Sequence, residues 1–164
     1  MKKRYYILLI IGLCLIDQIS KLLVIKYLSN NDSFIIINNL LKFLYIKNTG
    51  ISFGILGGRV YVIIALSILI ISYMISEFIK SKNKLHLISS VLIISGAFGN
   101  LIDRIFRGYV VDFISFSFFG YEMAIFNIAD SFITIGVILY IISILLEKKK
   151  WYNILGVIIN YEEV

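Results

Sequence analysis

Uncharged, strongly apolar runs recur four times along the chain, with polar segments between them. The runs are Tyr5–Ile16, Val60–Ser76, His86–Ile102 and Ser131–Leu146, with the imidazole of His86 counted as neutral. A helix needs about 20 predominantly apolar residues to cross the hydrocarbon core of a bilayer, within a range of about 17–25. With their flanking residues, the runs predict four membrane-spanning helices at about 5–28, 60–79, 86–102 and 128–146.

The first run has some features of a cleaved secretory signal, because it follows the basic start Met1–Arg4. A lipoprotein signal needs a small residue just before its cysteine, but Leu13 precedes Cys14 here. The apolar pattern also continues as far as Leu28, which is too long for the apolar region of a signal peptide. We therefore expect an uncleaved first helix.

The composition agrees with a membrane protein and argues against a cytosolic enzyme and a Cys/His metal site. Of the 164 residues, 60% are hydrophobic and 16% are charged, and the mean hydropathy is +0.94. A soluble domain has about 45–50% apolar and about 25% charged residues, so an ordinary cytosolic enzyme is disfavoured. Cys14 is the single cysteine and His86 the single histidine, which excludes an internal disulfide and a Cys/His metal site. We expect no metal and no cofactor.

The 16 basic residues are sorted by segment rather than spread evenly. Three groups of three Lys or Arg residues lie in segments 1–4, 80–85 and 147–164, whereas the long segments 29–59 and 103–127 together hold five. Four helices place all three groups on one side of the membrane, and the positive-inside rule assigns that side to the cytoplasm. This sorting explains the net charge of +6 without a nucleic-acid partner. Both termini should be cytoplasmic, and the two long loops should face outward.

The two outward loops contain short runs of β-branched and aromatic residues. Phe34–Ile37 and Phe43–Ile46 in the first loop, and Tyr109–Phe119 in the second, are typical of strands. Residues Lys47–Gly50 have the composition of a turn. Non-helical backbone is tolerated near a membrane only where protein or water satisfies its hydrogen bonds. We expect a small extracytoplasmic platform on the bilayer surface, and the alternative is an apolar linker that rests on lipid headgroups.

The tail 147–164 follows the last predicted helix. Trp151, Tyr152 and Tyr161 flank an apolar run there, which is typical of a segment at the membrane interface. The sequence indicates no role for this tail.

One ionisable pair lies inside the first predicted helix. An intramembrane charge costs at least about 2.5–3.5 kcal/mol on insertion scales, so it needs a reason. Asp17 and Lys21 are four residues apart and share a helix face. Asp17 lies about 18 Å along the helix from Tyr5, which places the pair in the outer half of the bilayer. A self-neutralising ion pair and hydrogen bonding toward the outer loops are both consistent with this position.

Small and polar residues gather at the outer end of the third predicted helix. Gly96 and Gly99 permit close approach of another backbone, either a neighbouring helix or a substrate chain. Asn100 and Arg104 are four residues apart on one face, which suits helix packing or a binding role.

Two acids with apolar neighbours lie at the predicted outer face. Asp112 is within a strand-like run, and Asp130 is where the fourth helix enters the membrane from outside. Burial raises the pKa of a carboxyl group, and two adjacent carboxylates cannot both ionise cheaply. One protonated and one ionised Asp can together activate water against an amide. Asn127 and Asp130 also resemble a capping box, which by itself explains an acid at the positive end of a helix.

Five segments together resemble the lipoprotein signal peptidases, the signal peptidase II family of bacterial integral-membrane aspartyl proteases. The matching segments are Asp17–Lys21, Lys47–Gly50 with Ser52–Gly54, Gly96–Arg104, Gly108–Ile114, and Phe126–Ser131 followed by Thr134–Gly136. They occur in the family's order and spacing over about residues 17–136, and five such segments in order are very specific.

The resemblance implies an all-α integral membrane fold, a four-transmembrane-helix bundle with a small extracytoplasmic β-cradle and a short helix near the surface. It implies an aspartic endopeptidase that removes the signal peptide of prolipoproteins by cleaving before a diacylglyceryl-modified cysteine. Asp112 and Asp130 match the family's catalytic aspartates. Its polar site-lining positions and its first-helix pair are matched by Asn48, Gly96, Asn100, Arg104, Asn127, Asp17 and Lys21.

One departure from the family concerns the approach to Asp130. Family members often carry a proline shortly before the Phe-Asn-x-Ala-Asp motif, where this chain has Met123–Ile125 and no proline at any position. We expect a less rigid approach to Asp130 as a result.

These features predict where the protein works and what it binds. We expect a multi-pass monomer in the bacterial cytoplasmic membrane, with its active site at the outer face. Its partners would be prolipoprotein substrates that carry a lipidated cysteine, together with membrane lipids. Polar side chains should hold the substrate backbone or stabilise developing charge, namely Asn48, Asn100, Asn127 and Arg104.

Three other functions use the same residues. A small proton-coupled transporter would use Asp17, Lys21 and Asp130 as a relay, but it predicts acids near the midplane and repeat symmetry, which the sequence lacks. A metal-dependent lipid phosphotransferase would use Asp103 with the two outer acids, although Asp103 is also four residues from Arg107 and suits a plain ion pair. A serine mechanism with Lys21 is compatible with residue type alone.

Overall fold

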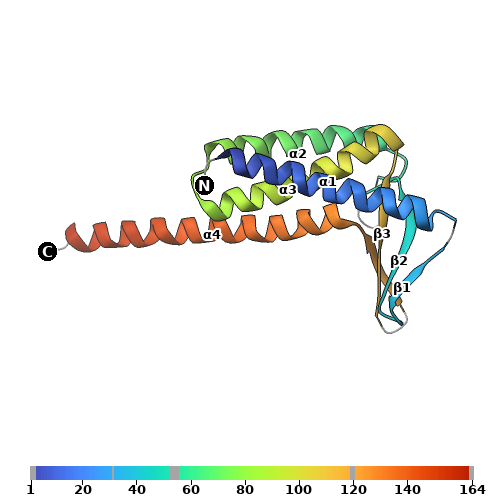
Figure 1. Ribbon diagram of the computed structural model, residues 1–164. Coiled ribbons are helices and arrows are strands. Elements are labelled where there is room, and N and C mark those ends of the chain that lie inside the picture. The colour runs from blue at the N-terminus through green and yellow to red at the C-terminus, as the bar shows by residue number, and fades with distance from the viewer. Residues whose placement is uncertain (1–2, 31, 52–55, 119–120, 163–164) are drawn as a thin grey trace.

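The computed structural model describes residues 3–30, 32–51, 56–118 and 121–162. It contains four helices, which are α1 (Lys3–Leu28), α2 (Val60–Lys80), α3 (Lys84–Arg107) and α4 (Ile128–Glu162). It also contains four strands, which are β1 (Phe34–Ile37), β2 (Leu41–Asn48), β3 (Val110–Phe118) and β4 (Tyr121–Phe126). The helices lie side by side and the strands form one sheet at one end of them (Figure 1).

The four helices are long and apolar enough to cross a membrane, which confirms the predicted four-helix membrane fold. About two thirds of the most apolar stretch of α3 is buried (67%), against 17–22% for the other three helices. Helix α3 therefore forms the centre of the bundle and packs against each of its neighbours. The exposed apolar faces of α1, α2 and α4 are left for lipid.

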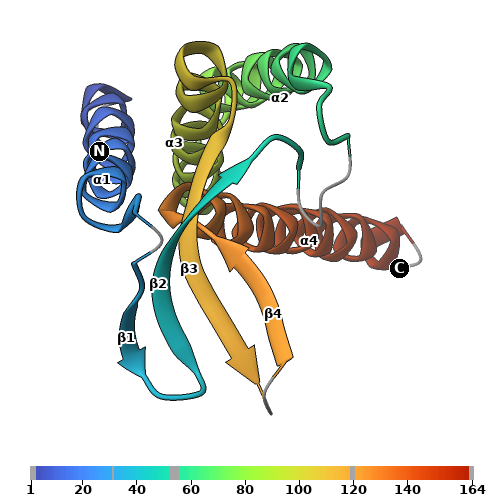
Figure 2. The same cartoon turned by 90° about the vertical axis from the view of Figure 1, so that its right-hand side faces the viewer.

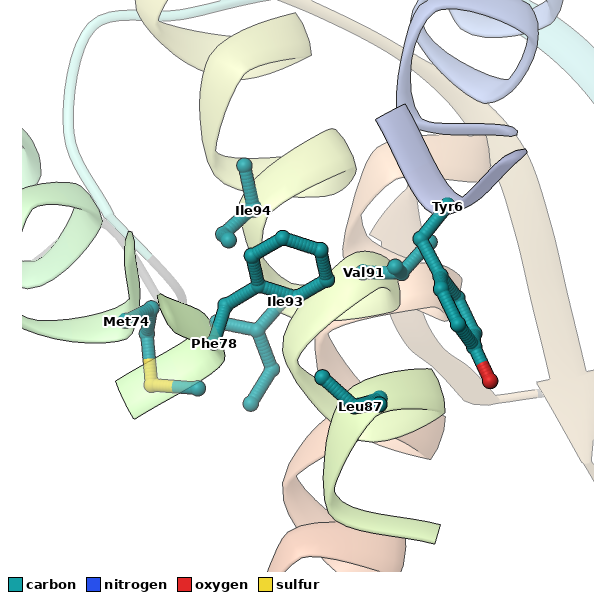
Figure 3. Close-up of a cluster of buried hydrophobic side chains, with 7 residues drawn as sticks. All are labelled: Tyr6, Met74, Phe78, Leu87, Val91, Ile93 and Ile94. Carbon is teal, nitrogen blue, oxygen red and sulfur yellow. The ribbon is translucent and has the colours of Figure 1, made fainter. Parts of the chain in front are cut away.

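A cluster of buried side chains from three helices holds together the half of the bundle opposite the sheet (Figure 3). Tyr6 of α1 meets the ring of Phe78 of α2 edge to face, with 6.1 Å between ring centroids. Leu87 and Val91 of α3 lie between these two helices. Because lipid tails are as apolar as these side chains, close packing rather than exclusion of water stabilises the contact.

Helix α3 is longer than the predicted span 86–102. It begins after Asn83, whose Oδ1 accepts from the backbone N–H of Leu85 at 2.9 Å, and it ends at Gly108, which has a φ of +78°. Glycine adopts this left-handed conformation without a steric penalty and terminates helices in this way. The loop predicted at 103–127 therefore begins only at Gly108, and Arg104 belongs to the last turns of α3.

Helix α4 is also longer than predicted, because it continues without a break through the expected tail 147–164 as far as Glu162. Its membrane-spanning part is Ile128–Glu147, which agrees with the apolar run used to predict it. The tail is thus a continuation of the fourth helix, and it points away from the sheet (Figure 1).

The sheet is antiparallel throughout, with the strand order β1-β2-β3-β4. It confirms that the two loops form a small sheet, and β1 has the predicted bounds. Strand β2 extends to Asn48, which pairs with Val110, so the turn predicted at Lys47–Gly50 begins one residue after Asn48. Strand β4 was not predicted, and the described part of the chain contains no short surface helix of the kind that the resemblance implies.

The sheet crosses the end of the bundle where α1 and α3 finish and where α2 and α4 begin (Figure 2). Val24 of α1 packs against Val111 and Phe113 of β3, which fixes the sheet to the helices. Both long connections thus lie at one end of the bundle, and the chain's start and the α2–α3 connection lie at the other (Figure 1).

Candidate active site

A groove of about 1150 Å³ lies between α2 and α4 and reaches the sheet. We call it the α2–α4 groove. Helix α3 separates α2 from α4 and forms its floor with Ile93, Ala97 and Asn100. The other walls include Ile63 and Ile70 of α2, Ser131 and Thr134 of α4, the ends of β2 and β3, and residues 123–126 of β4. Asp112 and Asp130 both line it, at the end nearest the sheet.

Asp112 lies near the start of β3 and is only 3% exposed. Asn48 Nδ2 donates to its Oδ2 at 2.7 Å, and Asn127 Nδ2 donates to its Oδ1 at 2.7 Å. Burial raises the pKa of Asp112 from 3.8 to about 6, and the nearby Asp130 adds to the rise. The hydrogen bonds from Asn48 and Asn127 oppose the rise, because they stabilise the charged carboxylate.

Asp130 lies in the first turn of α4 and takes part in the predicted capping box. Its backbone N–H donates to Asn127 Oδ1 at 2.9 Å, and its own Oδ2 accepts from the Asn127 backbone N–H at 3.1 Å. Its other oxygen, Oδ1, accepts from Asn100 Nδ2 at 2.8 Å. The cap therefore occupies only one carboxylate oxygen, and Asp130 still faces the groove.

Asn127 connects the two acids, because its side-chain Nδ2 binds Asp112 while its backbone N–H binds Asp130. The residue is fully buried and does not line the groove. Its side-chain amide has protein partners on both atoms, and a role of Asn127 in holding a substrate backbone stays a prediction.

Asp17 and Lys21 lie behind the groove rather than in it. Lys21 Nζ is 2.8 Å from Asp17 Oδ2 and 3.1 Å from Asp103 Oδ2, and all three side chains are fully buried. Asp17 Oδ1 accepts from the backbone N–H of Ala129 at 3.0 Å, which ties α1 to the start of α4. The sequence allowed either an ion pair between Asp17 and Lys21 or hydrogen bonds from them toward the site. The structure contains both.

Asp103 has more partners than the plain ion pair with Arg107 that its spacing suggests. Besides Lys21 and Arg107, its carboxylate accepts from the backbone N–H of Val111 at 3.1 Å and from Gln18 Nε2 at 3.2 Å. It thereby anchors β3 one residue before Asp112. Sequence spacing shows only the Arg107 contact, because the other partners are distant along the chain or belong to the backbone.

Gly96 is close to a helix, not to a substrate. A Cβ at Gly96 would lie 2.8 Å from Ile133 Cγ1 and closer still to the carbonyl oxygen of Ala129. Gly99 is closed in the same way by the carboxylate of Asp17. Neither glycine lines the α2–α4 groove, and a direct role of Gly96 in substrate binding stays a prediction.

Arg104 and Asn48 shape the mouth of the groove. Arg104 Nη2 donates to the carbonyl oxygen of Gly50 at 2.9 Å, and Asn48 Oδ1 accepts from the Gly50 backbone N–H at 2.9 Å. Both side chains line the groove, and their predicted role toward a substrate stays a prediction. The motif residues Ser52–Gly54 lie outside the described part of the chain.

The arrangement brings together two carboxyl groups, with amide donors behind them and a groove in front. Asp103 contacts Lys21 and not the other two acids, so the three carboxylates required by a phosphotransferase do not meet. Among the described residues, no group of three His, Cys, Asp or Glu side chains lies where it could hold a metal ion. Two paired carboxyls beside an open cavity suit general acid–base chemistry on a bound chain.

Comparison with known proteins identifies similar sequences. A family model described as signal peptidase (SPase) II matches residues 9–146. The chain is 37% identical over 156 residues to the lipoprotein signal peptidase of Staphylococcus haemolyticus (strain JCSC1435), a match that covers 92% of this chain and 99% of that protein. It is 38% identical over 148 residues to the lipoprotein signal peptidase of Bacillus pumilus (strain SAFR-032), with 89% and 95% covered.

A solved structure has the same fold. It is described as a bacterial membrane enzyme determined by the in meso method at 2.3 Å resolution, and it matches with a TM-score of 0.79 and 37% identity. The match covers 89% of this chain and 90% of the other. The resemblance that the sequence motifs indicate is thereby confirmed.

Proposed function

The chain belongs to the signal peptidase II family, and on this basis we propose that it removes signal peptides from prolipoproteins by an aspartic mechanism with Asp112 and Asp130 as the catalytic pair. The observation that carries the mechanism is the bridge through Asn127, which holds one oxygen of each acid at the wall of one groove. Family membership supports a peptidase and gives no support to a transporter.

The two acids would share one proton. The raised pKa of Asp112 and its closeness to Asp130 favour a pair in which one carboxyl is protonated and the other ionised. We assign the proton to the pair, because strongly coupled acids titrate as a unit.

The reaction then balances with water alone. The ionised carboxylate takes a proton from water while the water oxygen attacks the scissile carbonyl carbon. The protonated carboxyl donates its proton to the carbonyl oxygen. Collapse of the tetrahedral intermediate breaks the C–N bond, and the leaving amine takes up the proton that the first carboxylate gained. As the C=O bond re-forms, one hydroxyl of the intermediate returns its proton to the second carboxylate, which restores the starting pair. Asn48 and Asn127 hold Asp112 in place during these transfers.

The signal segment would enter sideways from the bilayer. The α2–α4 groove is lined by apolar side chains over the membrane-spanning part of the helices, such as Ile63, Ile70 and Ile93. An apolar helix of a precursor fits there. Of the two alternatives for Gly96 and Gly99, a neighbouring helix and a substrate chain, the close contacts with α4 and Asp17 favour packing within the protein. The two lipid chains of a diacylglyceryl cysteine would remain in the bilayer and set the depth of the scissile bond, at about 0.8 kcal/mol per buried CH₂.

The protein would have its site at the outer face of the bacterial cytoplasmic membrane. The basic residues near the chain's start and in segment 80–85 lie at the end of the bundle opposite the sheet, which supports cytoplasmic termini by the positive-inside rule. One chain supplies both acids and the whole groove, which supports a monomer as the working unit.

Cleavage of a defined precursor tests this proposal. Purified protein should cut a lipidated precursor once, immediately before the modified cysteine, at the same rate with and without EDTA. A matched precursor with an unmodified cysteine should be cut far more slowly, because its scissile bond is not held at the two acids. Equal kcat/KM for the two precursors in the same detergent would contradict the lipid requirement. Loss of cleavage in EDTA, with recovery on adding a metal ion, would contradict the aspartic mechanism.

A further inference from the structure

The outer edge of β4 borders the α2–α4 groove. Strand β4 is last in the sheet order and pairs only with β3 among the described strands. Its residues Met123–Phe126 all line the groove. Their backbone therefore lies beside the cavity that also contains the two acids.

The pattern of lining residues shows whether the groove contacts the face of the sheet or the edge of a strand. Successive side chains of a strand point to opposite faces of a sheet, so a cavity on one face meets every second residue. Strand β3 follows this rule, because Val110 and Asp112 line the groove and the fully buried Val111 does not. Strand β4 breaks the rule, because four consecutive residues line the groove. Residues 46–48 of β2 do the same where β2 extends past its pairing with β1, so consecutive lining residues occur where a strand has one paired side among the described strands. The groove therefore meets the edge of β4.

The strand register supports the same conclusion. Ile114 pairs with Phe126 and Phe116 pairs with Ala124, so Phe126 and Ala124 lie on the same face of the sheet as Asp112. Ile125 points to the opposite face and still borders the groove. Its contact with the groove is explained by the strand edge.

The four residues of β4 that border the groove carry no side chain of the kinds that prevent strand pairing. Exposed edges are usually blocked by proline, by charged side chains or by a covering element. Residues Met123–Phe126 include no proline and no charge, and Met123 is 64% exposed. Beyond Phe126 the chain passes directly to Asn127 and the first turn of α4, which carries Asp130.

We propose that the substrate residues next to the scissile bond bind as a fifth strand on the edge of β4. This inference rests on the proposed peptidase function and adds how the enzyme recognises the extended part of its substrate. Four residues of β4 give an edge of about 13 Å, which pairs with about four substrate residues. Main-chain hydrogen bonds would supply the affinity, so that the enzyme accepts varied side chains there. The direction of β4 leads the bound chain to the two acids.

Removal of single backbone N–H groups from the substrate tests the proposal. A series of lipidated precursor peptides would carry one N-methyl group each, at successive positions flanking but excluding the scissile bond. A second series would carry an ester in place of each amide, which removes the N–H without adding a methyl group. Peptides modified well inside the apolar signal segment serve as controls.

The expected result is an alternation of period two. At every second position, the N-methyl group should lower kcat/KM by about tenfold or more, the ester should lower it in the same register, and the neighbouring positions should change little. A flat profile, or one without alternation, would overturn the fifth-strand proposal. If the unmodified lipidated peptide is also not cleaved, the proposed function fails rather than the binding mode.

Discussion

Lys21 of α1 orients Asn100 of α3, with its Nζ 2.9 Å from Asn100 Oδ1. Asn127 Nδ2 donates to the same oxygen at 3.2 Å. Because Oδ1 accepts both hydrogen bonds, the amide of Asn100 must direct its Nδ2 toward Asp130 Oδ1, which lies 2.8 Å away. Lys21 therefore acts on Asp130 through Asn100, without touching the groove.

Replacement of Lys21 should be costly for folding. Lys21→Met leaves the fully buried Asp17 and Asp103 without their shared cation, and loss of one partner of a buried ion pair costs about 3–5 kcal/mol. Denaturation in detergent micelles measures this change. The double variant Lys21→Met/Asp103→Asn removes one charge of each sign, so its loss of stability should be smaller than the sum of the two single losses. Additive losses would show that the two side chains do not interact as described.

Gly96 should tolerate no side chain. Gly96→Ala places a Cβ against the Ala129 backbone and Ile133, so α4 must shift and carry Asp130 with it. We expect a loss of about 1–3 kcal/mol in stability and a lower kcat, measured by unfolding and by cleavage of a lipidated precursor. Gly12→Ala is the matched control, because nothing lies within 4 Å of its added Cβ. Equal behaviour of the two variants would contradict the close packing of α3 on α4.

Asp112 should make the stability of the protein depend on pH. Its pKa is about 6 in the folded protein and 3.8 ordinarily, so between about pH 4 and pH 6 the folded state holds a proton that the unfolded chain has released. The free energy of unfolding should therefore fall as pH rises through this window, by about 3 kcal/mol in total, and stay level above it. Asp112→Asn should lose this slope, whereas Asp32→Asn, at an exposed acid, should keep it. Identical slopes in the parent and Asp112→Asn would refute the assignment.

The orientation in the membrane can be measured by chemical labelling. In a Cys14→Ser background, Asn30→Cys at the sheet end of the bundle should react with an impermeant thiol reagent added outside intact cells. Lys82→Cys in the α2–α3 connection should react only after the membrane is opened. Both positions are exposed at the surface of the protein, so access depends on the side of the membrane. Labelling of Lys82→Cys from outside intact cells would contradict the proposed orientation.

Hydropathy predicts the four helices because each needs about 20 predominantly apolar residues to cross the bilayer, and this requirement is local. The predicted helix ends are wrong where polar residues stay in the helix because their side chains bind other parts of the protein. Arg104 and Arg107 remain helical because their side chains bind Gly50, Gln18 and Asp103. Gln18 lies in α1 and Gly50 in the β2–α2 connection, so neither partner can be deduced from a short window of sequence around α3.

The strands show the same division. The run Phe34–Ile37 consists of β-branched and aromatic residues and is predicted correctly. Strand β4 contains Glu122, Met123 and Ala124, which have weak strand preference, and it forms because β3 offers it a paired edge. The same pairing orders the approach to Asp130, where the sequence without proline suggested a less rigid segment.

Sequence motifs and position along the chain identify Asp112 and Asp130, but they do not identify most of the hydrogen bonds that hold the two acids in place. Asn127 follows from its place before Asp130 in the cap, whereas its bond to Asp112 crosses from one element to another. Asp103 illustrates the limit most clearly. Its bond to the Val111 backbone places β3 and therefore Asp112, and no side-chain pattern in the sequence indicates a bond to a backbone N–H.

The central claim is that Asp112 and Asp130 act as one catalytic unit, and turnover of Asp112→Asn, Asp130→Asn and the double variant tests it most directly. The substitutions preserve side-chain volume, and Asp32→Asn controls for the loss of a negative charge on the same side of the bundle. Each single variant should fall to background cleavage of a lipidated precursor while remaining folded in the membrane, and the double variant should be scarcely slower than either single one. Turnover near that of the parent protein in either single variant would contradict the account.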